Sequence, residues 1–305
     1  MTTAPSSTYH PGERAVQARA GVLVRADHVG RGIRDDVPAV AAAFLEQRRM
    51  IVVGAADERG RLWASLLTGP PGFVRSPDVR TLTVAARPHP DDPLAATLDG
   101  PARVGLIAVE PETRRRMRVN GSARPDGDGL LIRAEQVYAN CPKYIQRREL
   151  TAAGLPPATG GRVTRGTGLT ADQQDRIRAA DTFFVATAGP DGAADASHRG
   201  GNPGFVTVTD GHRLRWPDYS GNSMFMTLGN ITTRPAAGLL FPDWRTGGVL
   251  MLTGTARVAW DRDPDGEDGR GVDFTVTEAV ELPGISTLRW GAPEFSPANP
   301  PVREA

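Results

Sequence analysis

The side chains best suited to chemistry lie in residues 197–201, where the sequence reads SHRGG. The planar guanidinium of Arg199 carries donors that match a phosphate group. Gly200 and Gly201 let backbone N–H groups come close to an anion. His198 is either a proton donor or a neutral hydrogen-bond partner, because an ordinary histidine pKa of about 6.5 permits both states. Together these residue types indicate an anion-binding site.

A second polar stretch, residues 216–230, reads WPDYSGNSMFMTLGN. Asn222 and Asn230 each follow a glycine, and an Asn amide both donates and accepts hydrogen bonds, as the edge of a heteroaromatic ring requires. Tyr219 and Trp216 are suited to stack on such a ring. A phosphate and a planar polar ring describe a nucleotide or a flavin. The alternative is that the Gly-Asn pairs are plain turns and that Trp216 belongs to the core.

Both stretches belong to one half of a chain that repeats itself. Short strings recur in the same order, first at an offset of 132 residues and then at 133. A single inserted loop residue explains the change of offset, since loops accept insertions at little cost. The order of the matches predicts a tandem duplication. The matching segments are 65–74 with 197–206, 104–108 with 237–241, 120–124 with 253–257 and, more loosely, 134–142 with 277–283.

The two copies differ at the residues suited to chemistry. Leu66 and Leu67 stand where the second copy has His198 and Arg199, and we expect the leucines to cover core or interface. Two copies of one fold tend to pack about a pseudo-twofold axis, which creates two equivalent sites. Because the second half alone keeps the polar set, the sequence predicts one functional site, with the first half as scaffold and partner surface.

Each half begins with the pattern of an amphipathic helix followed by that of a buried strand. Asp35 or Asp36 is the expected cap of the first helix, and Thr170 with Gln173 forms a capping box for the second. Runs that alternate apolar with polar residues follow, so each half is predicted to be an antiparallel barrel of about six short strands. The expected helices and first strands are residues 37–49 and 50–56, then 169–181 and 182–188, and the expected hairpin turns are 57–60 and 189–192.

The chain is therefore predicted to be mainly β, with a few short helices, and to have four parts. An N-terminal arm at residues 1–35 precedes a first half at 36–150. A linker rich in Gly, Pro, Ala and Thr at 151–168 leads to a second half at 169–305. The second half carries a longer Asp- and Gly-rich loop at residues 261–271, where an insertion is tolerated.

The composition restricts the partners. The 305 residues include 36 basic and 35 acidic side chains, so the formal net charge is +1 and no broad field gathers nucleic acid or an anionic membrane. A small molecule or another protein is the expected partner. The single cysteine, Cys141, cannot form an internal disulfide, and no stretch approaches about 18 consecutive apolar residues. With no secretion signal pattern at the N-terminus, the sequence favours a cytoplasmic location.

Three other features have plain interpretations. The basic run at residues 114–118 is interpreted as a solvated strand face or an interface, because the net charge is near zero. His89, Asp91 and Asp92 lack the further ligands of a metal site, so no metal is expected. Cys141 is interpreted as a packed thiol, since no second cysteine can resolve it. The signatures of serine hydrolases, zinc proteases and phosphate-loop enzymes do not occur in the sequence.

Several strings resemble the pyridoxamine 5'-phosphate oxidase-like family of FMN-binding split barrels, in particular its flavin-nucleotide-binding branch. The strings are HRGGNPGFV, WPDYSGN, TLGN, AGLLFPDW and LTGTARVAW, and the resemblance extends over nearly the whole chain. It implies tandem split barrels that form an intrachain pseudo-dimer. It also implies that FMN binds at the interface between the two barrels.

The resemblance further implies which residues hold the cofactor. Arg199 is the first choice for the phosphate, and His198 is the candidate for a catalytic role. Met226 and Met117 stand where we expect Asn from the family pattern, and Met cannot make the hydrogen bonds of an Asn amide. The residues implied at the cofactor are Ser197, His198, Arg199, Gly200, Tyr219, Asn222, Thr227 and Asn230 from the second half, with Lys143 and Arg147 from the first.

The activity implied by the resemblance is that of an FMN-dependent oxidoreductase acting on a small organic substrate. In some relatives a ferredoxin-reductase module follows, but this chain has neither its cysteine cluster nor a dinucleotide fingerprint. Electrons would then come from a separate reductase, from NAD(P)H or from the substrate. The alternatives are a non-catalytic protein that holds flavin or haem, and a deazaflavin-dependent reductase. A monomer contains a complete pseudo-dimer, and a homodimer is equally compatible with the sequence.

Overall fold

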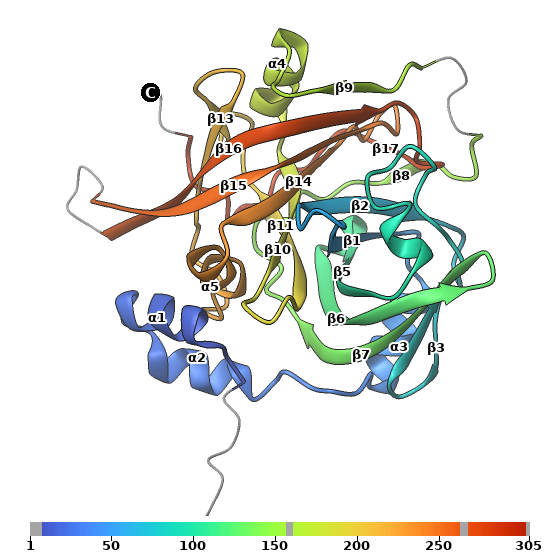
Figure 1. Cartoon of the computed structure of the whole chain (residues 1–305), viewed down its shortest axis with the longest axis horizontal. Coiled ribbons are helices and arrows are strands. Elements are labelled where there is room, and N and C mark those ends of the chain that lie inside the picture. Colours follow the sequence, from blue (N-terminus) through green and yellow to red (C-terminus); the bar gives the residue numbers. More distant parts are fainter. Residues whose placement is uncertain (1–7, 157–160, 263–267, 303–305) are drawn as a thin grey trace, which may run out of the picture.

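Two antiparallel sheets of matching topology form the frame of the molecule (Figure 1). The computed structural model describes residues 8–156, 161–262 and 268–302. The first sheet has the strand order β2-β1-β5-β6-β7-β4-β3, and the second has the order β11-β10-β14-β15-β16-β13-β12. The two orders are the same when nine is added to each strand number of the first sheet, so that β1 corresponds to β10 and β7 to β16. The predicted fold class, two tandem split barrels in a mainly β chain, is confirmed.

Three short helices precede the strands of the first barrel. Two short 3-10 turns lie between strands of this barrel, one before and one after β5. The described sheet has seven main strands instead of the expected six or so, because the short β3–β4 hairpin adds an edge to it. The helices α1, α2 and α3 span Pro11–Arg19, Leu23–Gly30 and Ala39–Glu46; β1 to β7 span Met50–Ala56, Leu62–Thr68, Val74–Asp78, Thr81–Val84, Ala102–Glu110, Arg115–Asp126 and Gly129–Ala139; and the turns η1 and η2 span Thr97–Asp99 and Pro111–Thr113.

The second barrel has one helix before its first strand and another at its centre. Short strands between and after the two sheets tie the chain together, because β8 pairs with β17 and β9 pairs with β16. The elements are β8 (Leu150–Ala152), β9 (Thr164–Gly166), α4 (Ala171–Ala179), β10 (Thr182–Ala188), β11 (Ala194–Gly200), β12 (Thr207–Val208), β13 (Arg213–Pro217), α5 (Met226–Thr233), β14 (Ala236–Pro242), β15 (Val249–Arg262), β16 (Asp268–Leu282) and β17 (Arg289–Trp290).

The helix caps follow the sequence prediction in one half and depart from it in the other. Before α4, the Thr170 hydroxyl accepts from the Gln173 backbone N–H at 3.3 Å and the Gln173 side chain accepts in return, as predicted. The expected cap of α3 is wrong. Pro38 occupies the N-cap with no side-chain hydrogen bond, while Asp36 pairs with Arg34 at 2.7 Å. The proline shifts the helix start beyond the reach of the aspartate.

The predicted linker is partly structured, since β8 and β9 lie within or at the edge of residues 151–168 and make backbone ladders with the second half. The Asp- and Gly-rich loop at 261–271 lies partly outside the described residues. The division into arm, two halves and linker stays a prediction.

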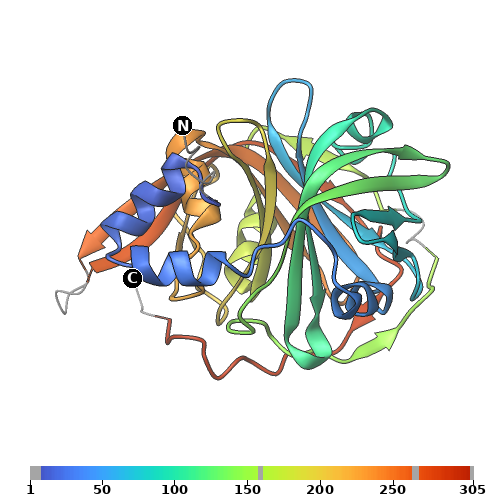
Figure 2. The ribbon, with the colours of Figure 1, turned by 90° about the horizontal axis from the view of Figure 1, so that it is seen from below.

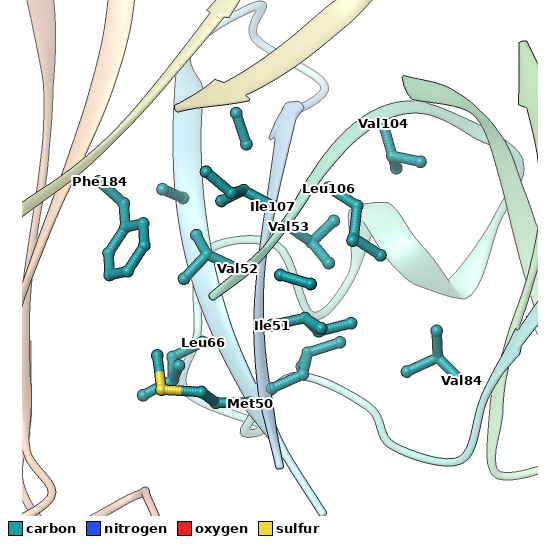
Figure 3. Close-up of a cluster of buried hydrophobic side chains, with 14 of the residues drawn as sticks. Met50, Ile51, Val52, Val53, Leu66, Val84, Val104, Leu106, Ile107 and Phe184 are labelled. Atoms are coloured by element: carbon teal, nitrogen blue, oxygen red, sulfur yellow. The ribbon is translucent and has the colours of Figure 1, made fainter. Parts of the chain in front are cut away.

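The two barrels share a dry interface. Phe184 of β10 belongs to the same buried cluster as Val52 and Ile107 of the first barrel (Figure 3). The backbones approach closely at two related places. A Cβ at Gly238 of β14 would lie 2.5 Å from the Leu62 carbonyl oxygen, and one at Gly105 of β5 would overlap the Asp195 backbone. Only glycine allows this approach, which explains why the repeats 104–108 and 237–241 share it.

Helix α1 covers α5 of the second barrel, and α2 packs beside α1 (Figure 2). Gly12 of α1 faces Gly229 of α5 at backbone contact, and the side chain of Gln17 donates to the Met224 carbonyl at 2.9 Å. The loop that leads into α5 is therefore held from outside by α1. This loop forms one wall of the site described below.

Candidate functional site

A polar cavity of about 90 Å³ lies between the barrels. Its walls come from both halves, because β6 and the segment 140–144 belong to the first and β11 and the loop 217–225 to the second. The first turn of α5 forms the remaining wall. Alternation along β6 turns Arg116 and Arg118 toward β11 and leaves Met117 on the opposite face, in the apolar cluster. The cavity exists only where the two sheets meet.

Arg118 is the neutralised cation of the cavity. It donates to both Asp195 carboxylate oxygens, at 2.9 and 3.1 Å, and to the Tyr138 hydroxyl at 3.2 Å. It also donates to the Ser197 hydroxyl. All of these groups are buried, so the ion pair holds its two strands together in a low-dielectric region and leaves no charge for a ligand.

Arg116 and Arg199 are cations of a different kind. Arg116 has no carboxylate partner among the described residues, and Arg199 has only Asp218, at 4.0 Å. The Nε atom of each guanidinium, like that of Arg118, is buried without a hydrogen-bond partner in the described structure. Burial first, and then the positive charges of Arg118 and Arg199, lower the pKa of Arg116 to about 9. An anion bound between the two guanidinium groups would satisfy both.

His198 lies at the centre of this cluster. The imidazole is buried and its pKa is held well below 6.5, first by burial and then by the charges of Arg116, Arg199 and Arg118. Arg116 Nη1 lies 2.8 Å from Nδ1 of His198. Because a guanidinium only donates, Nδ1 must accept, which places the imidazole proton on Nε2. Of the two roles that the sequence allows, the neutral hydrogen-bond partner is the one that this geometry favours.

Two segments that line the cavity have strained backbone. Tyr144 of the segment 140–144, and Ser223 and Phe225 of the loop 217–225, have positive φ angles of 68°, 64° and 57°. The Tyr144 hydroxyl donates to the Ser220 carbonyl at 2.8 Å, and its ring lies 5.1 Å from that of Tyr219, centroid to centroid. Non-glycine residues adopt this conformation at a cost of about 1–3 kcal/mol each, and such residues concentrate at functional sites.

The structure brings most of the sequence-predicted cofactor residues to one place. Ser197 is fully buried behind the wall, where its hydroxyl accepts from Arg199 at 2.8 Å. Among the predicted residues, those that line the cavity are His198, Arg199, Gly200, Tyr219, Asn222, Thr227 and Lys143.

Two of the predicted residues lie elsewhere. Asn230 donates to the Thr187 hydroxyl at 2.9 Å, and its Oδ1 lies 2.8 Å from Nε2 of His10, because α1 packs on that side of α5. Arg147 faces the C-terminal segment, where it pairs with Glu294 at 2.9 Å. Trp216 is core, as the alternative had it, with its ring 5.2 Å from that of Phe183.

Sequence reasoning missed Arg116, Arg118 and Cys141, which all line the cavity. The run 114–118 was interpreted as a strand face or an interface, and no local signal distinguishes an interface from a ligand wall. Cys141 is half-buried, so it is less packed than predicted. Met226, at a predicted departure from the family pattern, also lines the cavity, and the Tyr138 hydroxyl lies 2.7 Å from its sulfur.

The pseudo-symmetric counterpart of the cavity is filled. β11 contacts β6 at the site, and β2 contacts β15 at the related place. With the sequence offsets of 132 and 133, Leu66 and Leu67 replace His198 and Arg199, and Val249 and Met251 replace Arg116 and Arg118. All four are buried, as expected for the two leucines. The void left there has a volume of about 10 Å³, and the rings of Trp244 and Trp290 pack against each other beside it.

Other kinds of site find no support in the described part of the chain. No group of three or more His, Cys, Asp or Glu side chains is placed to hold a metal ion there. Asp92, from the sequence PHPDD, instead accepts from the Ser65 hydroxyl at 2.6 Å, and burial raises its pKa to about 6. None of the described helices is both long and apolar enough to cross a membrane.

Comparisons with known proteins relate the second barrel to a protein family. A search among curated proteins found no match. Solved structures similar to the chain include HupZ from Group A Streptococcus (16% identity, 37% of this chain and 99% of that chain, TM-score 0.31). Others are a protein related to general stress protein 26, of the pyridoxinephosphate oxidase family, from Clostridium acetobutylicum (15%, 39% and 91%, 0.30) and the haem storage protein HutZ from Vibrio cholerae (12%, 39% and 96%, 0.29).

The family model described as pyridoxamine 5'-phosphate oxidase matches residues 169–269. This segment contains β10 to β15, and with them His198, Arg199 and the loop 217–225 that lines the cavity. The family resemblance noted in the sequence is therefore confirmed, and residues 169–269 of the second barrel match the pyridoxamine 5'-phosphate oxidase family.

Proposed function

We propose that the protein binds FMN in the cavity between the barrels, with the phosphate held by Arg199 and Arg116. The observation that carries this proposal is the pair of cavity guanidinium groups, on Arg116 and Arg199, that have no carboxylate closer than 4.0 Å among the described residues and whose Nε atoms are buried without partners. A phosphate presents several charge-assisted acceptors to such donors, each contributing roughly 1.5–3 kcal/mol. His198 adds an Nε2 donor beside them.

The part of FMN beyond the phosphate must extend outside the cavity, because its volume of about 90 Å³ is well below the roughly 300 Å³ of a typical ligand pocket. Tyr144 and Tyr219 line the cavity, and their rings are suited to pack on a planar ring system. Asn222 and Asn140 line the same cavity from different halves, and the Asn140 Oδ1 atom is buried without a partner in the described structure. These side chains match the polar edge of such a ring.

We further propose that the protein is an FMN-dependent oxidoreductase acting on a small organic substrate. FMN supplies hydride or electron transfer when bound, and the protein supplies orientation and electrostatics. Arg116 and Arg199 keep the cavity positive and so favour negative charge on whatever it holds. The neutral His198 can donate a hydrogen bond from Nε2 without carrying a charge of its own. NAD(P)H or a separate reductase is the proposed electron source.

The filled counterpart supports one cofactor per chain. Leu66, Leu67, Val249 and Met251 offer no donor to a phosphate, and the void beside them holds less than a cofactor needs. We therefore expect one FMN per polypeptide, whether the protein is a monomer or a homodimer.

The absorption spectrum of the purified protein, with identification by mass of any released molecule, tests this proposal. A flavin spectrum with about one FMN per chain is the expected result. Deazaflavin or haem in its place, or no uptake of added FMN, would refute the cofactor assignment. Consumption of NADH or NADPH by the loaded protein then separates an oxidoreductase from a non-catalytic flavin carrier.

The phosphate assignment has a sharper test in Arg199→Gln. Loss of a charge-assisted hydrogen bond should weaken FMN binding, measured by titration calorimetry, roughly tenfold or more. Arg213→Gln is the matched control, because Arg213 is exposed and pairs with Asp210 on the far side of β13. Equal FMN affinity in the two variants contradicts the role of Arg199.

A further inference from the structure

A second, larger cavity opens beside the candidate cofactor site. It is a groove of about 980 Å³ on the first barrel, between α3 and the strands β6 and β7. Its floor and sides are mostly apolar, with Ala41 and Phe44 from α3 facing Met117 and Val137 from the sheet. A volume of this size is at the upper end of the range for small-molecule pockets.

The groove and the cofactor cavity share two side chains. Arg116 and Asn140 line both of them. Each carries a buried polar atom without a partner in the described structure, Nε in Arg116 and Oδ1 in Asn140. A molecule in the groove therefore ends next to whatever fills the cavity, and the two unsatisfied groups lie at that junction.

The charge of the groove is unbalanced. Six arginines line it against a single acidic residue, Glu110. Arg49 and Arg116 have no carboxylate partner among the described residues. The other four arginines are paired: Arg34 with Asp36, Arg48 and Arg115 with Glu110, and Arg114 with Glu294.

Arg49 is the unpaired arginine that lines the groove and not the cofactor cavity. It directly precedes β1, which pairs with β5. The guanidinium of Arg116 instead lies in the cofactor cavity, where Nη1 is 2.8 Å from Nδ1 of His198. An apolar groove with an excess of arginines, among them the unpaired Arg49, is complementary to an apolar molecule with one negative group.

We propose that this groove binds an apolar organic anion, the substrate of the flavin site, with its charged group at Arg49 and its apolar body against α3. The substrate role rests on the function proposed above, whereas the binding of the anion does not.

Two fluorescent probes of the same shape test the binding. Anilinonaphthalene sulfonate carries the negative group, and N-phenylnaphthylamine lacks it. The sulfonate should bind at one site per chain, and Arg49→Gln should weaken it roughly three- to tenfold while Arg49→Lys largely restores it. The affinity of the neutral probe should not change. If the two probes respond alike to Arg49→Gln, the groove does not select an anion and the proposal is wrong.

A surface substitution provides the second test without risk to folding. Val40 of α3 lines the groove and is 79% exposed, so Val40→Glu places a negative charge at the rim. Sulfonate binding should weaken, and neutral-probe binding should change less. Val79→Glu is the matched control, because Val79 is 60% exposed and lies outside the groove. Equal losses in the two variants contradict the location.

The FMN content of the same variants separates the two proposals. Arg49 does not line the cofactor cavity, so Arg49→Gln should retain FMN. A protein that binds no FMN but shows the expected probe selectivity keeps the anion groove and loses the flavin assignment. In the FMN-loaded protein, saturation with the sulfonate should alter the visible flavin absorption through the shared junction. Bound sulfonate without any such change refutes the substrate role.

Discussion

Buried charge defines the site at the scale of single residues. In the lining of one cavity, Arg118 has a carboxylate partner, Arg116 has none among the described residues, and His198 is kept neutral. Like charges held together without counterions destabilise the ligand-free protein, and an anionic ligand removes that cost on binding. FMN or another phosphate compound should therefore raise the unfolding temperature more than a neutral flavin such as riboflavin does.

Glu13 gives a pH-dependence that belongs to this scale. The carboxyl is buried under α5, and burial first, then Asp195 and Asp191, raises its pKa to about 8 from 4.5. Between these two values the folded protein holds a proton that the unfolded chain releases, so the free energy of unfolding falls as pH rises through this window. Glu13→Gln should remove this fall and stabilise the protein at pH 8 by up to a few kcal/mol.

Thermal unfolding of the variant and its parent, at pH 5 and at pH 8, measures this effect. Glu58→Gln is the control, since Glu58 is exposed in the β1–β2 turn. If the advantage of Glu13→Gln is the same at both pH values, the carboxyl is not protonated in the folded state.

At the scale of elements, the loop 217–225 controls the site. It is held on one side by α1, through Gln17 and Met224, and on the other by the Tyr144 hydroxyl on the Ser220 carbonyl. Its positive φ angles at Ser223 and Phe225 mark a segment that relaxes when released. Because the cavity is too small for a whole FMN, the proposed binding of FMN requires this loop to move.

Tyr144→Phe tests this gating. The ring remains against Tyr219 but the hydrogen bond to the loop is lost, so FMN should associate and dissociate faster while its affinity changes less. Stopped-flow measurement of flavin fluorescence gives both rates. Ser220→Ala is the control, because it keeps the backbone carbonyl that accepts the hydrogen bond. Unchanged rates in Tyr144→Phe rule out the gate.

At the scale of the whole molecule, the two barrels share one apolar cluster, so we expect them to unfold as one unit. Phe184 and Leu240 of the second barrel lie in the same apolar cluster as Val52 and Ile107 of the first. The cavity takes one wall from each barrel, so its geometry depends on this interface. A substitution that disturbs the interface should therefore lower the stability of both halves and weaken FMN binding at the proposed site.

Gly238→Ala is the corresponding prediction. The added methyl would lie 2.5 Å from the Leu62 carbonyl oxygen, so the barrels must separate locally. We expect a loss of roughly 1–3 kcal/mol in the free energy of unfolding, seen in one cooperative denaturant transition, together with weaker FMN binding. Gly100→Ala is the control, because a Cβ there meets only the Thr97 carbonyl at 4.0 Å. Two separate transitions, with one unaffected, contradict the single unit.

The sequence by itself determined the fold class, the α4 capping box and the presence of His198 and Arg199 together in one polar stretch. These depend on neighbouring residues or on the comparison of two copies. The cap of α3 could not be predicted because Pro38 moved the start of the helix. The short edge strands β8 and β9 form only against partners more than a hundred residues away.

Only the tertiary structure decided which residues surround the cavity. Arg116 and His198 are 82 residues apart and meet because β6 and β11 belong to different barrels. The same arrangement takes Asn230 and Arg147 away from the cavity, since α1 and the C-terminal segment offer them closer partners. A strand pattern specifies which face a side chain lies on. Which surface that face meets depends on how two barrels pack, and that packing is set by apolar burial spread over both.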